Sequence, residues 1–244
     1  MPRPIIGVTC SVDAEGDSSP KPRAFLNMAY TDAIFAAGGL AQPVPIPERP
    51  DARLIAELID SYDALLFTGG ADVNPHQYGQ IPHASTIAMH ERRDVFEVEF
   101  FRAADAADKP ILSICLGCQI ASVARGGCLI QHVDDLPRKT AIEHHKPNHG
   151  TAYHDVEIAT DSMLAKIVGR TRMEVNSRHH QVVDREQVGG SLKPVAFAPD
   201  GIVEAVEDQN KRFFLAVQWH PEDMIDRPEQ LRLFAALVNA ARKC

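Results

Sequence analysis

Runs of consecutive apolar residues alternate, in the first half of the chain, with longer stretches in which apolar and polar residues are mixed. Strands buried on both faces of a parallel sheet have continuous apolar runs, and helices usually connect them. The apolar runs predict strands at Ile5–Cys10, Leu40–Ile46, Asp63–Phe67 and Pro110–Ile114. The mixed stretches predict helices at Phe25–Ala37, Leu54–Ile59, Glu91–Ala107 and Leu116–Arg125. This order is typical of an α/β protein with a central, mostly parallel sheet.

The second half of the chain has shorter apolar runs. They predict strands at Asp155–Ile158, Thr171–Val175, Val195–Ala198, Ile202–Val206 and Phe213–Val217, followed by a last helix at Glu229–Ala241. Polar stretches with prolines predict surface loops at Ser11–Pro22 and Gln131–Gly150. Because no internal repeat or linker divides the chain, we expect residues 1–244 to form one domain.

Composition excludes several classes of protein. The content of 45% hydrophobic and 24% charged residues is that of an ordinary globular chain. A net charge of −8 disfavours nucleic acid as a partner. The first residues lack the apolar core of a signal peptide, and no apolar run reaches the ~18 residues of a membrane helix. Five cysteines, an odd number at irregular spacing, indicate reduced thiols. We therefore expect a cytoplasmic protein with no membrane partner.

The segment Ile111–Gln119 places a thiol between a predicted buried strand and a predicted helix. A sharp strand-to-helix turn raises one side chain above the sheet and needs small residues two positions to either side, which Ser113 and Gly117 provide. The dipole and free N–H groups of a helix start favour a thiolate. Cys115 is therefore a candidate nucleophile, although the position taken alone also suits an inert core cysteine.

A histidine and a carboxylate follow the last predicted strand, at His220 and Glu222. A thiol nucleophile needs an imidazole to take its proton, and a third group to orient that imidazole. Pro221 stiffens the turn between the two residues, so that Glu222 can reach the far nitrogen of His220. Alone, this tripeptide is a weak signal, because a histidine near a strand end is usually incidental.

Taken together, these segments resemble the class I glutamine amidotransferase-like superfamily, and within it most closely the γ-glutamyl-γ-aminobutyrate hydrolase family of cysteine peptidases. The superfamily pattern is Cys-x-Gly-x-Gln in mid-chain and Val-Gln-Trp-His-Pro-Glu near the C-terminus. The closer resemblance is carried by Thr68–Pro75 with Tyr78-Gly79, Arg92–Glu97, Asn176–Gln181 and Pro199–Ala205. These matches extend over nearly the whole chain.

The resemblance implies a flavodoxin-like three-layer α/β sandwich with the nucleophile at the C-terminal end of a central strand. It implies a hydrolase that releases glutamate and a free amine from a γ-glutamyl amide, through a γ-glutamyl thioester. The amine would be γ-aminobutyrate, a polyamine derivative or another amine, which places the reaction in polyamine catabolism. The implied partner is this small substrate, no cofactor is needed, and a homodimer is compatible with the sequence.

Residue by residue, the family pattern makes Cys115 the nucleophile, His220 the base and Glu222 its orienting partner. The oxyanion hole would consist of the backbone N–H groups of Gly70 and Leu116. The positions that match the family's substrate-binding residues are Gln119, Asn176, Ser177 and His179.

Three positions depart from the family pattern. Ser113 replaces the usual glycine two residues before the nucleophile, but serine is small enough to fit. Leu116 stands where close relatives often have arginine, which leaves the preference for γ-aminobutyrate open. Cys118 is an unusual neighbour for a catalytic thiol, and our hypothesis is that oxidation locks Cys115 in a reversible disulfide with it.

Three alternative functions remain open at this point. The chain could be a glutaminase subunit that delivers ammonia to a separate synthase, or a catalytically silent ligand-binding protein with the same fold. The sequence Cys115-Leu116-Gly117-Cys118 is also a C-x-x-C motif, as in thioredoxin-like oxidoreductases, but those domains are shorter and carry the motif early.

Histidines gather in one predicted loop, at His144, His145, His149 and His154. Imidazole is the commonest zinc ligand, so this group suggests a metal site. Neither a cysteine nor a compact set of carboxylates accompanies the histidines, and the implied mechanism needs no metal. We therefore predict that the protein has no metal site.

Overall fold

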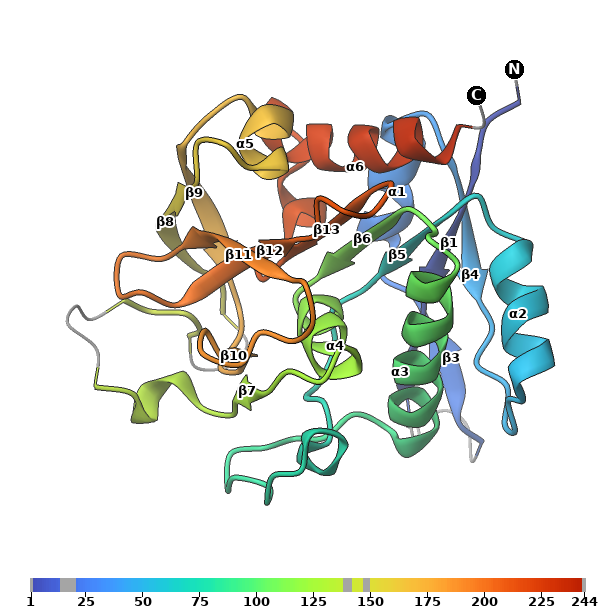
Figure 1. Ribbon diagram of the computed structural model, residues 1–244, viewed down its shortest axis with the longest axis horizontal. Coiled ribbons are helices and arrows are strands. Elements are labelled where there is room, and N and C mark those ends of the chain that lie inside the picture. Colours follow the sequence, from blue (N-terminus) through green and yellow to red (C-terminus); the bar gives the residue numbers. More distant parts are fainter. Residues whose placement is uncertain (1, 14–20, 138–141, 147–149, 243–244) are drawn as a thin grey trace.

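A nine-stranded sheet forms the centre of the computed structural model, which describes residues 2–13, 21–137, 142–146 and 150–242 (Figure 1). Its strand order is β4-β1-β5-β6-β13-β12-β11-β8-β9. The bounds are β1 Ile5–Thr9, β4 Leu40–Val44, β5 Ala64–Phe67, β6 Ile111–Ile114, β8 Ala152–Ile158, β9 Arg172–Ser177, β11 Lys193–Phe197, β12 Val203–Glu207 and β13 Phe214–Val217.

Strand β13 is where the direction of the sheet changes. It pairs in parallel with β6 and antiparallel with β12. The strands on the β6 side, β4, β1, β5 and β6, are all parallel to their neighbours, whereas β12, β11, β8 and β9 alternate in direction. The predicted α/β class with its central parallel strands is confirmed, and the second half of the chain adds an antiparallel extension.

Helices cover both faces of this sheet and give three layers (Figure 1). One face packs against α1 Met28–Ala36, α5 Met163–Val168 and α6 Pro228–Ala241, and the other against α2 Ala52–Asp60, α3 Glu91–Ala106 and α4 Leu116–Ala124. A separate hydrophobic cluster lies on each side, because the buried strands send alternate side chains to opposite faces. The layered sandwich is thus the one that the sequence predicted.

Two small antiparallel pairs lie outside the main sheet. Strand β2 Ser11–Asp13 pairs with β3 Arg23–Phe25, so the predicted loop Ser11–Pro22 contains a strand in its described part. Strand β7 Leu129–Ile130 pairs with β10 Val182–Val183. Short 3₁₀ helices are η1 Pro75–Tyr78, η2 Val133–Asp135 and η4 Pro221–Met224. In the predicted loop Gln131–Gly150, residues 138–141 and 147–149, with His149 among them, lie outside the described residues.

None of the helices in the described ranges is both long and apolar enough to cross a lipid bilayer.

Candidate active site

The parallel pairing of β6 and β13 brings together two segments that are about a hundred residues apart in the sequence. Ile114 pairs with Val217, so both strands end at the same edge of the sheet. One residue beyond this pair, the Cys115 N–H donates to the Val217 carbonyl at 2.8 Å. His220 follows β13 by three residues. The candidate nucleophile and the candidate base therefore leave neighbouring strands in the same direction, where open parallel sheets usually bind their ligands.

Cys115 has the strained backbone expected of a nucleophile on a sharp turn. Its φ is 53° and its ψ is −104°, a conformation that costs a non-glycine residue about 1–3 kcal/mol. Small neighbours allow the turn, because a Cβ on Gly117 would lie 2.6 Å from the Phe67 carbonyl oxygen. Helix α4 begins at Leu116, and its first N–H groups have no acceptor within the helix. Such groups suit a developing oxyanion.

His220 is held by Glu222 through a short hydrogen bond. Its Nδ1 lies 2.6 Å from Glu222 Oε1, and both side chains are buried. Burial alone would lower the pKa of His220, but the negative charges and hydrogen bonds of Glu222 and Cys115 outweigh burial and raise the pKa to about 10. The imidazole therefore keeps its proton at neutral pH, with a carboxylate on one side and the Cys115 sulfur as a further partner.

The backbone of His220 is fixed by a side chain from β9. Asn176 donates from Nδ2 to the His220 carbonyl at 2.8 Å, and its Oδ1 accepts from the His220 N–H, also at 2.8 Å. The amide of Asn176 is buried and uses both ends in this contact. Asn176, which the resemblance assigned to substrate binding, therefore fixes the backbone of His220 through both ends of its amide.

The predicted oxyanion residues, Gly70 and Leu116, lie side by side. A Cβ added to Gly70 would be 2.8 Å from Leu116 Cδ2 and 2.3 Å from Arg93 Nη1, so a side chain there would displace one of these buried groups. The preceding glycine is equally close to the candidate triad, since a Cβ on Gly69 would be 2.9 Å from His220 Cε1. The turn after β5 thus packs directly against the first residue of α4, which follows Cys115, and against His220.

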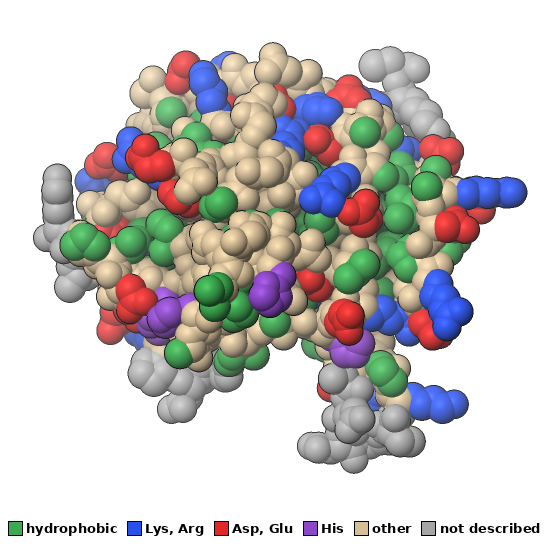
Figure 2. Space-filling model, turned by 60° about the horizontal axis from the view of Figure 1, so that its bottom comes forward, with side chains coloured by type: hydrophobic (Ala, Val, Ile, Leu, Met, Phe, Trp, Pro, Cys, Tyr) green, Lys and Arg blue, Asp and Glu red, His purple; other side chains and the backbone are tan. Residues whose placement is uncertain are grey.

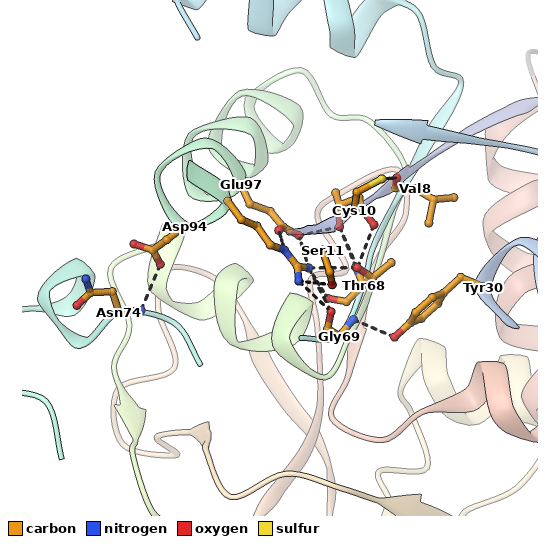
Figure 3. A network of polar contacts seen from close by, with 11 residues as sticks. Val8, Cys10, Ser11, Tyr30, Thr68, Gly69, Asn74, Asp94 and Glu97 are labelled. Atoms are coloured by element: carbon orange, nitrogen blue, oxygen red, sulfur yellow. Dashed lines mark hydrogen bonds and ion pairs between the residues drawn. The ribbon is translucent and has the colours of Figure 1, made fainter. Parts of the chain in front are cut away.

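A buried ion pair supports this turn (Figure 3). Arg93 Nε donates to Glu97 Oε2 at 2.5 Å, and both Arg93 terminal nitrogens donate to the Gly69 carbonyl at 3.2 Å. Arg93 also donates to Thr68 Oγ1 at 3.1 Å, and Glu97 accepts from Thr9 Oγ1 at 2.7 Å. One guanidinium therefore ties α3 to the end of β5. The sequence contained the Arg-x-x-x-Glu spacing but gave no sign of its partners.

Tyr30 of α1 reaches the same turn, and the sequence gave no signal for it. Its hydroxyl accepts from the Gly69 N–H at 3.0 Å (Figure 3). Burial, followed by the charge of Glu222, raises the pKa of Tyr30 well above its ordinary value. The neutral phenol therefore holds the backbone of the turn after β5 and lies near enough to Glu222 to be influenced by its charge.

The other three predicted substrate residues are buried among protein partners. Gln119 Nε2 donates to the Gln181 carbonyl at 2.9 Å, and Ser177 Oγ donates to the His144 carbonyl at 2.6 Å. His179 has 4% of its surface exposed and faces a buried carboxylate, and burial lowers its pKa to about 4. The structure therefore does not place these side chains on an open surface beside Cys115.

The more exposed neighbours in the same motif are Arg178 and His180. Arg178 pairs with Asp223 and lies 4.0 Å from Glu222. Burial would lower the pKa of Arg178, but the charges of Asp223, Glu222 and Cys115 raise it. A partly exposed cation therefore lies beside the carboxylate that orients His220. His180 Nε2 lies 3.1 Å from each carboxylate oxygen of Asp72, just beyond the glycine turn.

A cavity of about 350 Å³ adjoins the glycine turn. Gly70, Ala71, Met89, His90 and Arg93 are among the residues that line it. Its volume lies within the range of about 300–1,000 Å³ that is usual for small-molecule sites. The side of the molecule that comes forward in Figure 2 carries histidines at separate places among hydrophobic and acidic side chains.

Cys118 lies in the first turn of α4 and is 1% exposed. Burial, followed by the charges of Cys115 and Glu204, raises the pKa of its thiol. A buried, protonated thiol is a poor nucleophile in disulfide exchange. This environment argues against the hypothesis of a reversible disulfide with Cys115.

The chain is similar to several known proteins over most of its length. A Mycobacterium tuberculosis protein named "Putative glutamine amidotransferase Rv2859c" is 37% identical over 241 residues, which cover 98% of this chain and 75% of that protein. Gamma-glutamyl-gamma-aminobutyrate hydrolase PuuD of Escherichia coli (strain K12) is 30% identical over 236 residues, which cover 91% of this chain and 87% of that protein.

Among solved structures, the glutaminase domain of Trypanosoma brucei CTPS with bound acivicin has a TM-score of 0.67 at 18% identity, covering 97% of this chain and 93% of that chain. That likeness shows the class I glutamine amidotransferase fold. The model of the Peptidase C26 family matches residues 4–222, a span that includes Cys115, His220 and Glu222. The chain therefore belongs to the Peptidase C26 family and is a hydrolase with the class I glutamine amidotransferase-like fold.

Proposed function

We propose that the protein is a cysteine hydrolase that cleaves γ-glutamyl amide bonds, with Cys115 as the nucleophile, His220 as the acid and base, and Glu222 as the orienting group. The observation that carries the proposal is the pairing of a strained Cys115 at a helix start with a buried His220 bound to Glu222 at 2.6 Å. This is the arrangement that activates a weak nucleophile and holds its proton acceptor in one orientation.

The reaction follows from this placement. Cys115 Sγ attacks the γ-carbonyl carbon, and the N–H groups of Gly70 and Leu116 stabilise the oxyanion. When the C–N bond breaks, His220 gives its proton to the departing amine. A water molecule that loses its proton to His220 then attacks the γ-glutamyl thioester, which releases glutamate and restores the thiolate. Removing an oxyanion donor typically costs about 10²–10³ in rate.

Substrate preference is supported by charge and space around the site. Arg178 is a half-exposed cation close to Cys115 and Glu222, and we assign it to a carboxylate of the glutamyl group. The cavity beside Gly70 would accept the amine half of the substrate. The similarity to PuuD favours γ-glutamyl-γ-aminobutyrate or a related γ-glutamyl amine.

The decisive experiment measures glutamate release from a panel of γ-glutamyl amines by the wild type and by Cys115→Ala. The variant is expected to lose turnover and to keep the wild-type circular dichroism spectrum. In parallel, acivicin should add one adduct to the wild type and none to Cys115→Ser, although that variant keeps the other four cysteines. Full activity in Cys115→Ala would end the proposal.

A second function, glutaminase subunit of an amidotransferase, is favoured by the name of the Mycobacterium tuberculosis relative. The two functions differ in what the isolated chain can do. Steady hydrolysis of a γ-glutamyl amine without a partner supports the hydrolase. Glutamine hydrolysis that appears only when a synthase is added would support the amidotransferase instead.

A further inference from the structure

Three imidazoles and one carboxylate meet in the interior, away from the proposed triad. They are His144, His154, His179 and Glu204, and each is at least nine-tenths buried. They come from four separate segments, namely the loop before β8, strand β8, the turn after β9, and strand β12. One possible ligand atom from each residue lies within 4.8 Å of the others.

The three imidazoles surround a single oxygen. Glu204 Oε1 lies 3.4 Å from His144 Nδ1, 3.4 Å from His154 Nε2 and 3.5 Å from His179 Nε2. N–H···O hydrogen bonds are shorter, about 2.7–3.2 Å, and none of these four atoms has a hydrogen-bond partner among the described residues. Zinc bound tetrahedrally at about 2.0–2.1 Å separates its ligand atoms by roughly 3.3 Å. All three carboxylate-to-imidazole separations are close to that spacing, and the four atoms lie within 4.8 Å of one another.

Second contacts orient two of the imidazoles toward the centre. His144 Nε2 lies 2.9 Å from Asp200 Oδ2, and His154 Nδ1 lies 3.1 Å from the Asp155 carbonyl. Each contact takes a proton on the outer nitrogen and leaves the inner nitrogen free to bind a cation. Carboxylate or carbonyl partners of this kind accompany most histidine ligands of metals.

We propose that His144, His154, His179 and Glu204 bind one Zn²⁺ ion. Imidazole nitrogens and a carboxylate oxygen are zinc ligands, and four protein ligands in a buried centre make a closed, structural site. The proposed site departs from the prediction of no metal, and only His144 and His154 belong to the histidine group seen in the sequence. The missing carboxylate is supplied by β12 and the third imidazole by the segment after β9.

The metal-free alternative leaves more groups unsatisfied. Glu204 would need a protonated imidazole to balance its charge, and His144 lies between Asp200 and Glu204. Within the part of the chain that the structure describes, that proton would still leave His154 Nε2 and both ring nitrogens of His179 buried without hydrogen-bond partners. Each such group destabilises the folded protein, because it loses its hydrogen bonds to water and gains none in return. A bound cation uses one nitrogen of every ring.

The site is connected to the segments that hold His220. The Glu204 carbonyl accepts from the Gln218 N–H at 2.8 Å, two residues before His220. The His144 carbonyl accepts from the His179 N–H at 3.0 Å and from Ser177 Oγ at 2.6 Å. Ser177 follows Asn176, whose amide binds the His220 backbone. Zinc would therefore stabilise the segments that hold His220 in the proposed active site, without contacting the substrate.

The test begins with purified full-length protein that is stripped by dipicolinate and titrated with Zn²⁺ against a chromophoric chelator. We expect one Zn²⁺ per chain, a rise in Tm on loading, and intense visible bands of tetrahedral cobalt when Co²⁺ replaces Zn²⁺. His144→Gln and Glu204→Gln should weaken Zn²⁺ binding more than about 100-fold. The matched control is His145→Gln. His145 is the next residue after His144, but its partly exposed imidazole pairs with Asp134 outside the site.

A more conservative variant keeps the test decisive if the ligand variants fail to fold. Asp200→Asn leaves all four proposed ligands in place and removes the charge of the outer partner of His144, and it should weaken Zn²⁺ binding by about 10–100-fold. The proposal is overturned if folded wild type binds no stoichiometric Zn²⁺. It is equally overturned if the variants of His144, Glu204 and Asp200 bind Zn²⁺ as tightly as His145→Gln.

Discussion

The side-chain amide of Asn176 binds the peptide groups of His220 at two points, donating to its carbonyl and accepting from its N–H, both at 2.8 Å. A residue that the family resemblance assigns to substrate binding is thus occupied in fixing the candidate base. Because the contact spans 44 residues of sequence, it becomes visible only when β9 and β13 are placed in one sheet.

Replacing Asn176 by leucine should lower kcat by about 100-fold and leave KM nearly unchanged. The variant keeps the side-chain volume but leaves both His220 backbone groups unpaired, and a small displacement of a catalytic group costs about this much. Steady-state kinetics on the best γ-glutamyl amine measure both constants, with the exposed Asn239→Ala as the control. A raised KM with normal kcat would instead assign Asn176 to the substrate.

Gly70→Ala should reduce kcat by about 10²–10³. The added Cβ would lie 2.3 Å from Arg93 Nη1, so the glycine turn must move and carry its N–H away from the oxyanion. Gly38→Ala is the control, because it adds a methyl group at a positive φ in open space. That variant should cost stability and leave kcat unchanged. Equal kcat values for the two variants would remove Gly70 from the oxyanion hole.

The Arg93–Glu97 pair offers a test of stability. Arg93→Met leaves the Glu97 carboxylate buried without its partner and should lower the free energy of unfolding by about 3–5 kcal/mol. The double change Arg93→Met with Glu97→Met should recover part of this loss. Arg53 and Glu57 form an exposed pair at the same i,i+4 spacing, and Arg53→Met should cost less than about 1 kcal/mol. Urea unfolding measures all four proteins, and similar losses for both arginines would contradict the assigned role.

The raised pKa of His220 predicts a stability change with pH. Its folded-state pKa of about 10 lies above the ordinary value of 6.5, so the protonated imidazole stabilises the folded protein fully below pH 6.5. That contribution is lost as the pH rises from 6.5 through about 10. Glu222→Gln removes a main cause of the shift, so its stability deficit relative to wild type should shrink over this window. Thermal unfolding at several pH values checks this, and a deficit independent of pH would refute it.

The sequence predicted the parallel half of the fold well. Continuous apolar runs mark strands that are buried on both faces, so β1, β5, β6 and the helices after them lie within a few residues of their predicted bounds. The elements that were missed, β2 with β3, β7 with β10, and α5, are short. They depend on contacts with the rest of the fold rather than on local periodicity.

The candidate site was partly readable for the same reason. The bend at Cys115 has a local signature in small residues, and the spacing of His220 and Glu222 is local too. The positions assigned by resemblance to substrate binding, such as Ser177 and His179, turned out to have buried partners from distant segments. Long-range contacts of this kind leave no pattern in neighbouring residues.

Because β13 lies between β6 and β12, it is an interior strand although it is the last strand of the described chain. A growing polypeptide therefore exposes its thiol segment long before the imidazole segment has been synthesised, and the gap in the sheet stays open until then. Nascent chains would therefore remain inactive until that strand is in place. Hydrolytic activity would thus appear only after β13 has been inserted into the sheet.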